Sequence, residues 1–104
     1  MKTIQDYVKL IEERFALYDG KIGRSDVKWG IWSREMNLEI RKRIEGKDPI
    51  TPQLHHVFNL WTLYSQLLEL RHKYKGKLFG ANKIKQKVKE IKRMRAIINE
   101  DTHS

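Results

Sequence analysis

Apolar residues recur along this chain at helical spacing, and their pattern divides it into four segments. The first segment carries one apolar face with alternating intervals of four and three residues: Ile4, Val8, Ile11, Phe15 and Tyr18. This spacing is typical of a helix that buries one side. Thr3 and Asp6 can form a capping box at its start, and Asp19 with Gly20 is predicted to end it.

The segment 51–76 is apolar around most of its circumference. On a helical projection its apolar residues cover about two thirds of the circle, whereas a surface helix needs a stripe about half that wide. Thr51 is predicted to cap the helix through its hydroxyl, Pro52 suits the first helical position, and Gly76 is a natural stop. We therefore expect a central helix, packed on more than one side by other helices or by a second copy of the chain in a homodimer.

Between these two segments, residues 26–46 carry apolar side chains on successive helical turns: Met36, Ile40 and Ile44. Gly30 leaves two interpretations open, because either a short helical turn precedes Ser33 or one helix runs through the glycine. Gly46 is predicted to end this helix. Within it, Glu39 and Arg43 have the spacing of a favourable ion pair.

The last segment repeats the apolar spacing of the first: Ile84, Val88, Ile91 and Ile98. Asn82 is predicted to cap this helix, and residues 100–104 to form a frayed tail. Before it, Leu78 and Phe79 are expected to fold back and fill the core.

These segments predict an all-α fold: a small bundle of about four helices, near residues 3–18, 26–46, 52–75 and 82–99, around the central apolar helix 52–75. The length of 104 residues suits a single domain over residues 1–104. With 39% apolar and 34% charged residues, the composition is typical of a soluble globular protein.

Several kinds of site lack the residues that they need. The chain has no cysteine, so disulfides and thiolate metal sites are excluded. Residues 19–26 resemble half of an EF-hand loop, but Phe15 and Leu17 stand where oxygen ligands are required. His55 and His56 are adjacent and cannot share one helical face. We predict no metal, no cofactor and no enzymatic activity.

Location is predicted from the termini and from hydropathy. The first residues, 1–15, include acids in their first turns and do not form a signal-peptide pattern. No uncharged apolar run approaches membrane-spanning length. We therefore predict a cytoplasmic protein without a membrane partner.

Positive charge is concentrated in the last quarter of the chain. The net charge is +9, and residues 77–104 hold eight Lys and Arg against three Asp and Glu. Four cations fall on one stripe of the last helix, between about 80° and 180° from Ile84: Lys85, Lys89, Lys92 and Arg93. A straight row of cations can neutralise successive phosphates, so this stripe favours binding of nucleic acid, DNA or RNA. A solvated face, an acidic protein partner or a membrane surface would explain the same pattern.

Two further groups are candidates for binding. Arg34, Arg41 and Lys42 form a second basic group on residues 26–46, expected to pair with nearby acids first and to support nucleic-acid contact second. Trp29 and Trp32 either cover the end of the bundle or present an indole to a partner. With an exposed indole, the alternative function is a small protein-interaction module, an adaptor or inhibitor, that docks on an acidic surface of a larger protein.

Overall fold

The computed structural model describes residues 2–19, 25–74 and 78–103, and within these ranges it contains helices and no strand. The elements are α1 (Ile4–Tyr18), α2 (Ser25–Glu45), α3 (Thr51–Lys73), the short 3₁₀ turn η1 (Leu78–Gly80) and α4 (Ala81–His103). The predicted all-α bundle of four helices is confirmed.

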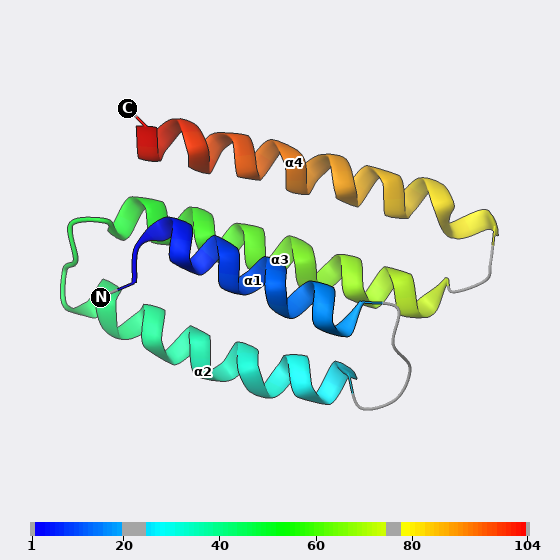
Figure 1. The fold of residues 1–104 in the computed structure, drawn as a ribbon, viewed down its shortest axis with the longest axis horizontal. Coiled ribbons are helices and arrows are strands. Elements are labelled where there is room, and N and C mark those ends of the chain that lie inside the picture. Colours follow the sequence, from blue (N-terminus) through cyan, green and yellow to red (C-terminus); the bar gives the residue numbers. More distant parts are fainter. Residues whose placement is uncertain (1, 20–24, 75–77, 104) are drawn as a thin grey trace.

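The four helices lie roughly side by side and alternate in direction along the chain (Figure 1). α1 and α3 form the middle of the molecule, α2 covers one side of this pair, and α4 covers the other. The result is a flat bundle with extents of 44 × 28 × 18 Å. The arrangement places α2 and α4 on opposite edges.

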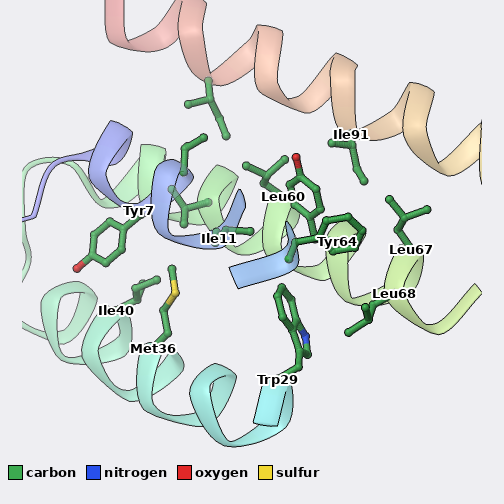
Figure 2. Packing of buried hydrophobic residues seen from close by; sticks show 14 of the residues in the cluster. Tyr7, Ile11, Trp29, Met36, Ile40, Leu60, Tyr64, Leu67, Leu68 and Ile91 are labelled. Carbon is green, nitrogen blue, oxygen red and sulfur yellow. The ribbon is translucent and has the colours of Figure 1, made fainter. Parts of the chain in front are cut away.

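The core is built around α3, as its apolar width predicts (Figure 2). Leu54, Val57 and Leu60 are fully buried, and side chains from the other three helices pack against this part of α3. Trp61 is partly buried, and its indole N–H donates to the hydroxyl of Ser33 on α2 at 2.9 Å. Neighbours within one chain therefore cover the wide apolar surface of α3, so this width does not require a homodimer.

The helix ends show where the sequence-based expectations hold and where they fail. Thr3 and Asp6 form the predicted capping box of α1. Thr51 does not cap α3 with its hydroxyl, which instead donates to the carbonyl of Asp48. α2 runs continuously through Gly30, where an added Cβ would meet nothing within 4 Å. The glycine is therefore compatible with an ordinary helical backbone.

The C-terminal part differs from the expectations at three points. α4 begins at Ala81, so Asn82 lies inside the helix and does not cap it. The helix continues to His103 instead of fraying from Glu100, because no glycine or proline interrupts it. Phe79 is 75% exposed and does not fill the core.

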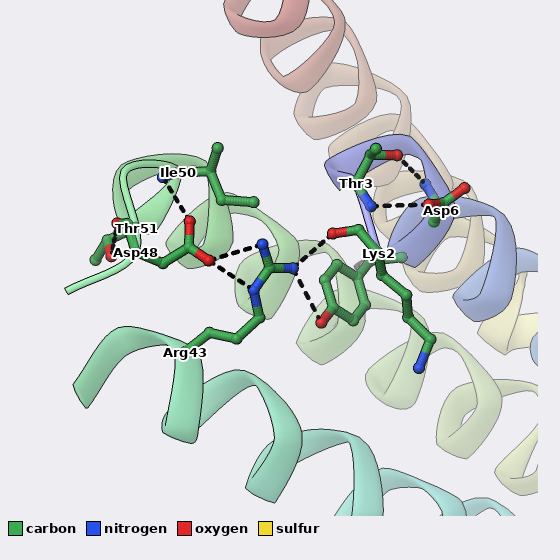
Figure 3. A network of polar contacts seen from close by, with 8 residues as sticks. Lys2, Thr3, Asp6, Arg43, Asp48, Ile50 and Thr51 are labelled. Atoms are coloured by element: carbon green, nitrogen blue, oxygen red, sulfur yellow. Dashed lines mark hydrogen bonds and ion pairs between the residues drawn. The ribbon is translucent and has the colours of Figure 1, made fainter. Parts of the chain in front are cut away.

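Arg43 joins the start of α1, the end of α2 and the following linker (Figure 3). Its guanidinium pairs with Asp48 at 2.8 Å and donates to the backbone carbonyl of Lys2 and the hydroxyl of Tyr7. The predicted pair with Glu39 is wrong, because Glu39 binds Lys2 instead. The backbone N–H of Ile50 donates to Asp48, and this bond, together with Arg43, lowers the pKa of the Asp48 carboxyl.

Candidate nucleic-acid interface

The basic stripe is positioned by the apolar seam on the opposite side of α4. Ile91 and Ile98 are 5% and 1% exposed, and Ile91 points from α4 toward the core (Figure 2). Ile84, Val88 and Met94 are partly buried against the same core. Because side chains on a helix are separated by about 100° per residue, this seam turns the stripe away from the bundle.

Three cations beside the stripe are held by other parts of the chain. Lys83 donates to the Tyr74 hydroxyl at 3.2 Å, and Lys87 contacts both Gln66 and Glu90 at 2.8 Å. Arg95 pairs with Glu12 of α1 at 3.4 Å. These contacts fasten α4 to α3 and α1, so they fix the rotation of α4 about its axis.

The four stripe residues themselves are exposed, and within the described part of the chain none of them has an ion-pair partner: Lys85, Lys89, Lys92 and Arg93. From Lys85 to Arg93 the stripe extends over about 12 Å of helix axis. The stripe therefore presents several positive charges to solvent on one face of α4, while the neighbouring cations are used within the fold.

A hydrogen-bonded chain behind the seam adds to this anchoring. The Tyr64 hydroxyl donates to Glu12 at 3.0 Å, and the same carboxylate oxygen faces Arg95. Burial raises the pKa of the Tyr64 hydroxyl, and the negative charge of Glu12 raises it further. The phenol therefore stays protonated and keeps donating to Glu12. The contacts of Glu12 with Tyr64 and Arg95 therefore connect α1 to both α3 and α4.

The second basic group lies apart from the stripe. Arg34, Arg41 and Lys42 are exposed on α2, at the opposite edge of the bundle from α4 (Figure 1). The expected internal pairing is wrong for these three, which form no ion pair among the described residues. Their neighbour Arg43 does form an ion pair, but with Asp48 of the following linker and not with the expected Glu39. The two basic groups do not form one continuous surface.

The two candidate indoles differ in their surroundings. Trp29 is 6% exposed, lies in the core and donates from its indole N–H to Ser65 at 2.9 Å. Trp32 is partly buried beside Trp29, with the guanidinium of Arg14 5.9 Å from its ring. Trp29 therefore has little surface left for a partner, and only Trp32 keeps a partly accessible indole.

Phe79, near the start of α4, was expected in the core and is instead an exposed aromatic. The ring of Phe79 packs edge-on against that of Tyr74, with 5.5 Å between the ring centroids. Gly80, directly after it, was the available signal, because a glycine between two helices can mark a close approach of the backbone to a side chain. In the described ranges, no three His, Asp or Glu side chains gather as a metal site would require.

No protein-family model, no curated protein and no solved structure matches this chain. Within the described ranges, no helix has both the length and the apolar character needed to cross a membrane.

Proposed function

We propose that this protein binds nucleic acid without catalysis, through contacts between the phosphate backbone and the basic stripe of α4. The supporting observation is the contrast between exposed and engaged cations on this helix. Lys87 and Arg95 pair with acids, whereas the four stripe residues have no such partner in the described part of the chain. Such contacts position a nucleic acid without reading its sequence.

The dependence of affinity on salt tests this proposal. Binding of fluorescently labelled DNA and RNA is measured by anisotropy over a series of salt concentrations. Four phosphate contacts predict a slope of log K against log salt of roughly −3 for a single strand and −4 for a duplex. Each of Lys85→Gln, Lys89→Gln, Lys92→Gln and Arg93→Gln should reduce the magnitude of the slope by up to about one.

A matched control separates the stripe from net charge. The variant K9Q/K28Q/K47Q/R71Q removes as many charges as the four stripe substitutions together, but from exposed residues outside α4. We expect it to weaken binding much less than the stripe variant does. Equal losses for the two variants would show that net charge alone attracts the ligand. Absence of binding at low salt to any DNA or RNA would disprove the proposal.

The alternative function, docking on an acidic surface of a larger protein, is supported by a different face. Ile31 and Leu38 are 58% and 57% exposed on α2, seven residues apart, and Trp32 on the same helix is partly buried. Arg34 and Arg41 flank this apolar pair in the sequence and would face an acidic partner. A pull-down from nuclease-treated cytosol tests this function. The protein recovered with the wild type should be lost with Leu38→Ala and kept with Lys89→Gln.

A further inference from the structure

Phe79 is the most exposed of the large apolar side chains that stand out on the described surface. It is 75% exposed, whereas Leu17, Ile31 and Leu38 range from 49% to 58%. An exposed phenylalanine forgoes much of the stabilisation that burial of an aromatic side chain provides. The next residue, Gly80, lies directly against Tyr74, because a Cβ at Gly80 would overlap the Tyr74 ring.

Two ammonium groups flank this aromatic pair. Lys73 and Lys83 lie 5.4 Å and 5.6 Å from the centroid of the Tyr74 ring, against which Phe79 packs. Lys83 also donates to the Tyr74 hydroxyl, and this hydrogen bond lowers the pKa of the phenol. Within the described ranges neither lysine forms an ion pair. The result is an exposed ring packed edge-on against a second ring, with two positive charges near that second ring.

Along the sequence, Phe79 of the aromatic pair directly precedes the helix that carries the basic stripe. α4 begins at Ala81, two residues after Phe79. Lys85 then lies about 6 Å and Arg93 about 18 Å along the helix axis from Ala81. An exposed ring on η1 therefore directly precedes the helix that carries the row of cations.

Proteins that bind single strands combine these two features: cations follow the backbone, and aromatic rings stack on bases. In a duplex the bases are stacked on one another and their faces are hidden inside the helix. We propose that the ligand of α4 is single-stranded nucleic acid, with its phosphates along the stripe and one base stacked on Phe79. This inference rests on the proposed function and specifies its substrate class.

The test compares a short labelled oligothymidine with a blunt duplex of the same length, for the wild type and for Phe79→Ala, Phe79→Leu and Phe79→Tyr. Loss of one stacked base should weaken single-strand binding about five- to 150-fold in the Ala variant. The Leu variant, apolar but not aromatic, should lose a similar factor, and the Tyr variant should stay near the wild type. The salt slope should not change, because Phe79 contacts no phosphate.

Ile31→Ala is the matched control, because this exposed apolar residue belongs to α2, which lies at the opposite edge of the bundle from α4 (Figure 1). It should leave both affinities unchanged, and thermal melting of each variant checks that the fold is intact. Equal losses on both ligands, or no loss in the Ala and Leu variants, would overturn the single-strand inference while leaving the stripe proposal in place. Binding that depends on Phe79 with anionic phospholipid vesicles but not with the oligothymidine would also overturn it. Absence of binding to both nucleic acids would instead reject the proposed function.

Discussion

The residue after the end of α2 that adopts the left-handed backbone conformation is Lys47, not a glycine. The helix ends at Glu45, directly before Gly46 as predicted, and it is the next residue, Lys47, that adopts a positive φ of 57°. The backbone N–H groups of Lys47 and Asp48 donate to the carbonyls of Ile44 and Arg43 at 3.0 Å and 3.1 Å. This is the Schellman arrangement, in which glycine normally takes the left-handed position. Placing a glycine at position 47 and a residue with a Cβ at position 46 should therefore stabilise the protein.

The expected gain follows from the backbone at each position. A left-handed backbone costs a residue with a side chain about 1–2 kcal/mol, and the greater freedom of glycine in the unfolded chain offsets about 0.5–1 kcal/mol of this. Lys47→Gly should therefore gain about 0.5–1 kcal/mol. A Cβ at Gly46 would lie 3.4 Å from the carbonyl oxygen of Lys42, an ordinary contact. Gly46→Ala should gain about 0.4–1 kcal/mol.

Urea unfolding, followed by circular dichroism and tryptophan fluorescence, measures these gains. The combined variant should gain about 1–2 kcal/mol, and Tm should rise by about 4–8 °C for each kcal/mol. Lys47→Ala is the control, because it removes the charge and keeps the Cβ. If Lys47→Gly is no more stable than Lys47→Ala, the positive φ is not what limits stability here, and the reasoning is refuted.

Three further substitutions test other parts of the fold. Gly80→Ala should destabilise the protein by about 1–3 kcal/mol or more, because its Cβ would overlap the Tyr74 ring, whereas Gly30→Ala should stabilise it by about 1 kcal/mol. Thermal melts of both variants check this, and equal effects would contradict it. The folded pKa of Asp48 lies below its unfolded value, so its contribution is present above about pH 4 and is lost as the pH falls through the folded pKa. Asp48→Asn should lower stability at neutral pH and flatten its decline in acid; an unchanged acid decline would disprove this.

The helices could be predicted because their apolar spacing repeats over several turns. Ile4, Ile11 and Phe15 lie on one face in the sequence and in the core of the structure. The width of the apolar surface of α3 likewise predicted a helix with neighbours on several sides. Such signals are local, because the spacing of apolar residues within one segment is enough to predict which face of that helix is buried.

The pairing of charges between helices could not be predicted, because it depends on residues distant in sequence. Glu12 and Arg95 belong to the first and last helices and meet only in the folded chain. Phe79 looked like a core residue by type, but its side chain is 75% exposed and its ring packs against that of Tyr74. For the stripe, the sequence predicted which face the cations share but not which of them would lack acidic partners.

The unpaired cations of the stripe lead to a last prediction, in which stability and binding change in opposite directions. Lys89 lies four residues from both Lys85 and Arg93, so it takes part in two like-charge pairs. Each such pair destabilises a helix by about 0.2–0.5 kcal/mol at low salt. Lys89→Gln should therefore stabilise the free protein by about 0.4–1 kcal/mol at low salt, less at high salt, while it weakens nucleic-acid binding.

Lys87→Gln is the contrasting variant, because Lys87 pairs with Glu90 and Gln66 and its loss should destabilise the protein. Urea unfolding at two salt concentrations, alongside the anisotropy assay, measures both effects. If Lys89 served only to solvate the surface, Lys89→Gln would not weaken nucleic-acid binding while it stabilised the free protein. If Lys89→Gln destabilises the free protein, then Lys89 contributes to the fold, and its exposed charge would no longer support a role in holding phosphate.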